Sequence, residues 1–232
     1  MATIVIDKFY QMDFKATEAY KTLRTNLLFC GDDKKVIGIT SCGANEGKST
    51  LSVNLSISLA EAGKKVLLID TDLRKSVLLG RYAAGTKVEG ISHYLSGQTE
   101  LINIINRTNI GTLQIIFAGK QPPNPSELLE TDYLRDAIKA LRKLYDYIII
   151  DTAPLGVVID AAIVARECDG TIMVVESGLN SYKFVSRIQH QLEITGTPIL
   201  GLVLNKVDMN RVRRYDRKYG YYYKKYSHYY GK

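Results

Sequence analysis

Short runs of apolar, largely β-branched residues alternate along the chain with longer stretches in which apolar positions recur every three or four residues. The first pattern predicts buried strands and the second predicts amphipathic helices. We expect strands at Val36–Thr40, Val66–Asp70, Leu113–Phe117, Tyr147–Asp151, Thr171–Val175 and Ile199–Asn205. We expect helices at about Ala16–Phe29, Lys48–Ala62, Asp132–Leu144, Ala161–Arg166 and Tyr182–Ile194. This alternation predicts a doubly wound α/β fold, with a mostly parallel sheet and helices on both faces.

A proline-rich segment interrupts this alternating pattern once, and the pattern stops near the C-terminus. Gly119–Leu129 reads GKQPPNPSELL, in which we expect Ser126 to cap a helix that carries Leu128 and Leu129 on its inner face. From Asp208 onward the aliphatic pattern stops. We therefore expect residues 1–210 to form the folded domain and residues 211–232 to form a mobile, solvated tail.

Composition places the chain among ordinary globular proteins. It has 232 residues, of which 46% are hydrophobic and 24% are charged, which is enough for one large α/β domain with a substantial core. Its three cysteines show no paired spacing, which favours a reducing cytosol. No run approaches 18 apolar residues and the first residues lack a signal-peptide layout, so we expect any work at a membrane to go through a partner.

The formal charge of +7 is concentrated in the predicted tail. Residues 211–232 hold eight Lys or Arg and one acid, whereas residues 1–210 hold 23 bases and 23 acids. A neutral body argues against a nucleic-acid-binding face, and we expect no nucleic-acid partner. The tail also holds eight of the sixteen tyrosines: Tyr215, Tyr219, Tyr221, Tyr222, Tyr223, Tyr226, Tyr229 and Tyr230.

A phosphate-binding loop is predicted at Val36–Thr50, VIGITSCGANEGKST, where an apolar strand runs through a small-residue loop into a helix. Backbone amides of such a loop face phosphates; here the loop residues are Gly43, Ala44, Asn45, Glu46 and Gly47. Lys48 is positioned for the β- and γ-phosphate oxygens, Ser49 for Mg²⁺, and Thr50 for the α-phosphate. The alternative is an unrelated helix cap, because GKS alone occurs often by chance.

Acidic residues end two of the predicted strands. VLLIDTDLR places Asp70 and Asp72 after one strand, on the same side of the chain, and YIIIDTAP places Asp151 after another. Ligands of open α/β sheets gather at these strand ends, and Asp151 has the Walker B arrangement for holding Mg²⁺. The alternative for Asp70 and Asp72 is a pair of helix caps.

Two other kinds of polar residue carry no catalytic prediction. We interpret Asp160, at the start of a predicted helix, as a cap. The three histidines have no metal-binding spacing: His93, His190 and His228.

Together, CGANEGKST, LLIDTDLR and IIIDTAP resemble the Walker A, A′ and B motifs of the bacterial tyrosine kinases (BY-kinases), relatives of the ParA/MinD ATPases that serve capsule and exopolysaccharide assembly. The DxDxR of Asp70–Arg74 distinguishes this family from other P-loop proteins. The resemblance covers residues 14–232, and PPNPSELL is similar to the family as well. The chain departs from the pattern at Cys42, where a glycine is usual, and at Ala44-Asn45, where Pro-Gly is common.

The resemblance implies an ATP-dependent protein tyrosine kinase. Lys48 would stabilise the transferring phosphoryl group, while Ser49, Asp72 and Asp151 would hold Mg²⁺ or its waters. Asp70 would accept the tyrosine proton, although Asp70 and Asp72 could exchange roles. The tail tyrosines listed above resemble the family's autophosphorylation cluster. Asn205–Asp208 matches the NKxD box that reads guanine in GTPases, but a similar asparagine lies by adenine in this family, so we expect ATP.

The resemblance also implies partners. Glu18, Lys21 and Arg24 resemble the family's E-x2-R-x2-R ring-interface motif with Lys21 in place of an arginine, which predicts a homo-oligomer; the alternative is a solvated helix face. A transmembrane adaptor of the chain-length-regulator type would activate the kinase, and a phosphotyrosine phosphatase would reset it. The protein would then be cytoplasmic and recruited to the inner face of the membrane.

A second interpretation is a ParA/MinD-like positioning ATPase whose basic tail binds membrane or nucleic acid. Those ATPases usually carry a second lysine early in the phosphate loop, and Cys42–Glu46 contains none. A P-loop scaffold without activity is disfavoured, because Lys48, Ser49, Asp70, Asp72 and Asp151 are all present.

Overall fold

The computed structural model describes residues 3–6, 13–83 and 88–208. The tyrosine-rich tail, and with it the predicted phosphoacceptors from Tyr215 to Tyr230, lies outside the described residues.

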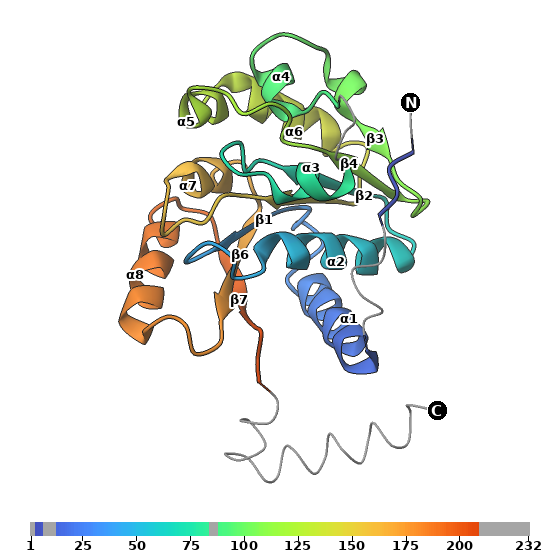
Figure 1. Cartoon of the computed structure of the whole chain (residues 1–232). Helices are drawn as coiled ribbons and strands as arrows, with labels where there is room; N and C mark the ends of the chain where they lie inside the picture. The colour runs from blue at the N-terminus through green and yellow to red at the C-terminus, as the bar shows by residue number, and fades with distance from the viewer. Residues whose placement is uncertain (1–2, 7–12, 84–87, 209–232) are drawn as a thin grey trace.

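A seven-stranded sheet forms the centre of the described structure (Figure 1). The strands are β1 (Val36–Ser41), β2 (Val66–Asp70), β3 (Asn106–Arg107), β4 (Leu113–Ile116), β5 (Tyr147–Asp151), β6 (Gly170–Glu176) and β7 (Ile199–Asn205). Their order is β3-β4-β2-β5-β1-β6-β7, and all pairs are parallel except β3–β4. The six predicted strands are confirmed. The two-residue β3 is too short to leave a hydrophobic pattern.

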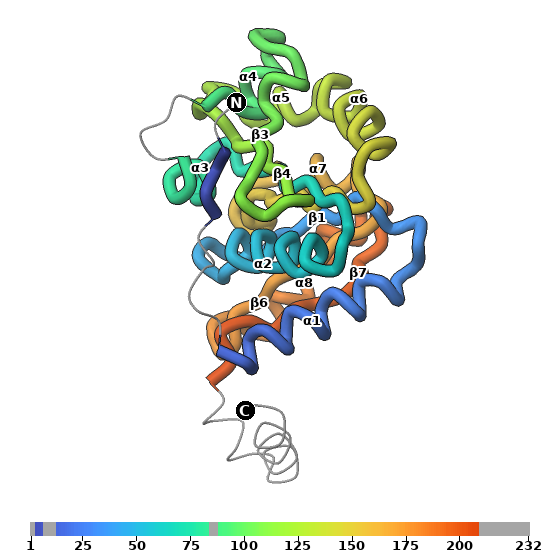
Figure 2. The backbone as a smooth tube through the Cα atoms, turned by 90° about the vertical axis from the view of Figure 1, so that its right-hand side faces the viewer, coloured from blue at the N-terminus to red at the C-terminus, as the bar shows by residue number. Residues whose placement is uncertain are grey.

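Helices cover both faces of the sheet, as the sequence predicted (Figures 1 and 2). One face packs against α1 (Phe14–Phe29), α2 (Lys48–Glu61) and α3 (Val77–Tyr82). The other face is covered by α4 (Ile91–Leu95), η1 (Leu101–Ile104), α5 (Pro125–Leu129), α6 (Asp132–Leu141), α7 (Asp160–Ala165) and α8 (Tyr182–Glu193). The short elements α3, α4 and η1 were not predicted, since their four to six residues span less than two helical turns.

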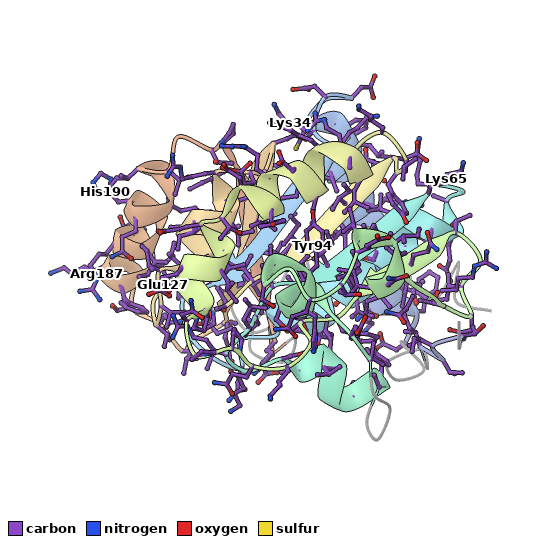
Figure 3. The ribbon with its side chains drawn as sticks, turned by 90° about the horizontal axis from the view of Figure 1, so that it is seen from above. Lys34, Lys65, Tyr94, Glu127, Arg187 and His190 are labelled. Atoms are coloured by element: carbon purple, nitrogen blue, oxygen red, sulfur yellow. The ribbon has the colours of Figure 1, made fainter. Side chains whose placement is uncertain are left out.

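The central strands are buried on both sides, which explains their continuous apolar runs. In β5, Tyr147 and Ile149 belong to the core on the α2 side, whereas Ile148 and Ile150 belong to the core on the α6 side. The parallel register sets Asp70 opposite Asp151 at the ends of β2 and β5. The strands therefore deliver the predicted acidic residues to one edge of the sheet, opposite the edge at which Lys34 and Lys65 precede β1 and β2 (Figure 3).

Two predicted caps are wrong. Asn124 occupies the N-cap position of α5 and Pro125 follows as its first residue, so Ser126 lies inside the helix. Proline is favoured there because its missing N–H would have no intrahelical partner. Asp160 is the first residue of α7, with Ile159 at the N-cap. Leu129 is buried and Leu128 packs partly against the core, as expected for the inner face.

Within residues 3–6, 13–83 and 88–208, no helix is both long enough and apolar enough to cross a membrane.

Candidate active site

The phosphate-loop residues from Gly43 to Gly47 connect β1 to α2, whose first turn carries Lys48, Ser49 and Thr50. Gly47 has φ +94°, and a Cβ there would lie 2.1 Å from Nδ2 of Asn205, so only glycine fits. Asn45 has φ +63°, in the left-handed region that asparagine tolerates better than most residues. Cys42 is not among the described residues with positive φ, so its backbone has no need of glycine.

Cys42 is a core residue rather than a reactive thiol. Its side chain is fully buried among apolar residues of α7 and β6, and burial raises the pKa of the thiol to about 11, with the Glu46 charge adding to the rise. A thiol with that pKa is not ionised at neutral pH.

Lys48 meets the predicted acidic residues at the ends of β2 and β5. Its Nζ lies 3.1 Å from Oδ2 of Asp72 and 3.9 Å from Oδ1 of Asp151, and it donates to Oγ of Ser49 at 3.3 Å. Burial disfavours its charge, but Asp151 and Asp72 outweigh that effect and raise the pKa of Lys48. The ammonium group is therefore held charged where phosphate oxygens would bind.

Asp70 and Asp151 are both fully buried. Burial raises the pKa of Asp70 to about 8, and the charge of Asp151 adds to the rise. The Asp70 carboxylate accepts hydrogen bonds from the Asp72 amide at 3.0 Å and from Oγ of Ser76 at 2.5 Å. Burial also raises the pKa of Asp151, although Lys48 partly offsets it. Burial thus disfavours charge on both carboxyl groups, and such perturbed pKa values are common at catalytic centres.

Oxygen ligands suited to Mg²⁺ lie together here, namely the Ser49 hydroxyl and the carboxylates of Asp72 and Asp151. Among the described residues, no group of three or more His, Cys, Asp or Glu side chains could hold a metal ion by itself. Mg²⁺ needs no such cage, because it is usually held by one or two carboxylates together with waters and substrate phosphates. The donor set therefore fits Mg²⁺ that arrives with a nucleotide.

A second polar cluster supports the acidic loop that follows β2. Arg74 contacts Asp160 through two nitrogens, at 2.8 and 3.0 Å, and Ser126 donates to the same carboxylate at 2.8 Å. Asp160 is completely buried. Arg74, two residues after Asp72 in the DxDxR motif, thus connects this loop to α5 and α7. The side chains of Ser126 and Asp160 are used in this cluster, which explains why they do not cap a helix.

The predicted interface residues lie on α1, beside α2 (Figure 2). Glu18 and Lys21 form an exposed ion pair at 2.7 Å. Arg24 turns to α2 and donates to the Ser58 carbonyl oxygen at 2.7 Å. Arg24 therefore supports α2 within one chain, whatever it does between chains. The role of these residues in assembly stays a prediction.

The structure brings the predicted residues Lys48, Ser49, Asp70, Asp72 and Asp151 together, and it sets Asn205 against the phosphate loop. Sequence reasoning missed Ser52 and Ser76. Ser52 donates to Asp151 at 3.1 Å, and its spacing of four residues from Lys48 on a helix was the available signal. His190 extends outward from α8, three quarters exposed, away from any of these groups (Figure 3).

Comparison with known proteins is consistent with this geometry. Residues 34–197 match the family described as AAA domain. The chain is 43% identical over 204 residues to the tyrosine-protein kinase CpsD of Streptococcus agalactiae serotype III, covering 88% of each protein. The kinase domain of the Escherichia coli tyrosine kinase ETK has a TM-score of 0.79 at 32% identity, covering 89% of each chain. The septum site-determining protein MinD of Pyrococcus horikoshii, complexed with Mg-ADP, has a TM-score of 0.64 at 27% identity, covering 75% of this chain and 71% of that one. The chain therefore belongs to the bacterial tyrosine-protein kinases, which share the P-loop fold of the MinD ATPases.

Proposed function

We propose that this kinase transfers the γ-phosphate of ATP to tyrosines of its own C-terminal tail, in trans between subunits, and thereby regulates the synthesis and export of capsular or other exopolysaccharide. The observation that carries the proposal is Lys48 held between Asp72 and Asp151, with Asp70 buried alongside. Phosphoryl transfer needs charge stabilisation and positioning more than covalent help, and this cluster supplies both.

Each residue of the cluster has a proposed part in the transfer. Lys48 binds the β- and γ-phosphate oxygens and stabilises charge on the transferring group. Ser49, Asp72 and Asp151 hold Mg²⁺, which neutralises phosphate charge when bound. Asp70 in its ionised form accepts the tyrosine proton, with Asp72 as the alternative base. A carboxyl pKa raised to about 8 favours this transfer, because it lies nearer than an ordinary carboxyl pKa to the value near 10 of the tyrosine hydroxyl. Thr50 binds the α-phosphate and Asn205 lies by the adenine.

The family supports further proposals on partners. A transmembrane adaptor recruits the cytoplasmic kinase to the inner face of the membrane and activates it, and a phosphotyrosine phosphatase resets it. The neutral charge of residues 1–210 supports partners other than nucleic acid. In a positioning ATPase of the MinD type, by contrast, the γ-phosphate would be released to water.

The fate of the γ-phosphate tests the proposal. Incubated with γ-labelled ATP, Mg²⁺ and the cytoplasmic segment of a candidate adaptor, the full chain should carry the label on peptides from residues 211–232. Replacing the eight tail tyrosines by phenylalanine should remove most label, because it removes the acceptor hydroxyls while keeping tail length and charge. Deleting residues 215–232 should do the same and leave ADP affinity unchanged. Label found only as inorganic phosphate would favour the ATPase.

Tail phosphorylation should weaken self-association. Each phosphate adds about −1.5 to −2 charges at neutral pH, so four cancel the excess of +7 in the tail. A neutral tail is no longer drawn to the polyanionic nucleotide of a neighbouring subunit. Light scattering should show larger assemblies before phosphorylation than after it, and equal masses in both states would contradict this. To test the predicted α1 interface in the same way, Glu18→Ala is a better variant than Arg24→Ala, because Arg24→Ala also removes a hydrogen bond to α2 within the chain.

A further inference from the structure

Two non-glycine residues of the described structure have positive φ, and they are hydrogen-bonded to each other. Asn45 in the phosphate loop has φ +63°, and Lys206, just after β7, has φ +53°. Nζ of Lys206 donates to the carbonyl oxygen of Asn45 at 2.7 Å. Unfavourable backbone conformations persist where the surroundings hold them, and they gather at functional sites. This bond fixes the direction of the peptide group between Asn45 and Glu46.

Glu46, the next residue of the loop, is hydrogen-bonded to the ends of the same neighbouring strands. Its buried carboxylate accepts hydrogen bonds from Nδ2 of Asn180 at 2.7 Å and from the Glu176 amide at 3.2 Å. Its carbonyl oxygen accepts one from Nδ2 of Asn205 at 2.9 Å. The ends of β6 and β7 and the loop before α8 thus hold two consecutive residues of the phosphate loop.

The charges in this cluster point to a role in shape rather than in phosphate attraction. Glu46 is an anion beside an anion-binding loop, so its charge opposes the binding of phosphates. Lys206 also pairs with Glu176 at 2.7 Å, so its ammonium group is shared between that carboxylate and the Asn45 carbonyl. Neither side chain is left free to contact phosphate directly. Both instead fix the backbone whose amides face the phosphates.

We propose that Glu46 and Lys206 are positioning residues: they hold the phosphate loop in its binding shape by anchoring it to the strand ends on the nucleoside side of the site. Loss of the Lys206 anchor releases the Asn45 carbonyl group, and loss of the Glu46 anchor frees the loop from Asn180 and the end of β6. In either case the loop pays an ordering cost when phosphates bind. This inference deepens the proposed function. It rests on the proposed function in one respect, namely that ATP and ADP are the ligands.

Binding of nucleotide fragments tests the anchors without using catalysis. Displacement of a fluorescent ADP analogue gives the affinities of Mg·ADP, Mg·tripolyphosphate and adenosine. For Lys206→Met we expect about tenfold weaker binding of ADP and tripolyphosphate, and adenosine affinity within about twofold of wild type, since adenosine makes no phosphate contacts. Lys206→Arg should recover part of the loss. Lys183→Met, which removes the same charge from an exposed position on α8, should change none of the three.

Glu46→Gln tests the other anchor at nearly constant volume. Its amide group would face the donor of Asn180 or of Glu176, so one hydrogen bond is lost. We expect the same selective loss of ADP and tripolyphosphate, and a KM for ATP raised about tenfold with kcat changed less than threefold. Equal losses for adenosine and ADP would show a base contact and overturn the proposal, as would unchanged ADP affinity in both variants. A failure of tyrosine phosphorylation in the wild-type protein would contradict the proposed function but leave these affinities readable.

Discussion

Replacing Lys48 by methionine should reduce the phosphotyrosine formed by the isolated chain at least about 100-fold, a loss typical of removing one group that stabilises charge in the transition state. The structure adds a second consequence. Lys48 is the cation beside Asp72 and Asp151, so its loss leaves buried carboxylates without their partner and should lower the melting temperature. Labelled ATP measures the first effect, and circular dichroism measures the second.

Lys139→Met is the matched control for that variant, because it removes the same charge from an exposed position on α6 and should leave both measurements unchanged. The Lys48→Met protein also tests transfer between subunits. Mixed with a chain that ends at residue 214, which keeps the active site but has no acceptor tail, it should regain label on its own tail. Full phosphorylation of the Lys48→Met protein in the absence of any other chain would contradict the assignment of the phosphate loop.

Replacing Asp70 by asparagine should abolish tyrosine phosphorylation while making the nucleotide-free protein more stable at pH 8. Burial and the charge of Asp151 raise the pKa of Asp70 to about 8, from an ordinary value near 3.8. The folded protein therefore keeps this proton at pH values where the unfolded chain has released it. Stability accordingly falls as the pH rises between these two values, and asparagine removes that contribution.

Thermal unfolding at pH 5 and pH 8, without Mg²⁺ or nucleotide, measures the effect. The wild-type melting temperature should fall more between these pH values than that of Asp70→Asn. At pH 8 the variant should melt several degrees higher, since about 1 kcal/mol corresponds to roughly 2–4 °C in a protein of this size. Asp151, whose pKa burial also raises, contributes to any slope that remains in the variant. If Asp70→Asn keeps full kinase activity, Asp72 is the base.

Much of the fold was accessible from hydrophobic periodicity alone. Strands buried on both faces leave continuous apolar runs, so β1, β2, β4, β5, β6 and β7 were predicted close to their observed bounds. The motifs on these strands then gave the main active-site residues, because parallel strands bring their carboxyl ends to one edge. Short elements escaped prediction: β3 has two residues, and α4 has five, too few for a periodic signal.

Side-chain partners were the part that sequence reasoning assigned wrongly. Ser126 and Asp160 both stand near the start of a helix, where a cap is the usual interpretation. In the folded chain they join Arg74 from another loop, 52 and 86 residues away in sequence. Helix-capping rules consider only residues that are close in sequence, so they cannot predict partners this distant.

The sequence by itself determined the strand–loop–helix that presents Lys48, the acidic strand ends and the charge of the tail. These depend on neighbours within a few residues or on a repeating pattern, and both can be read along the chain. Only the tertiary structure decided that Glu46 is held by Asn180, 134 residues away, and Asn45 by Lys206, 161 residues away. Single hydrogen bonds between distant segments have no period and no local signature. They exist only because β1, β6 and β7 end side by side, which is a property of the assembled sheet.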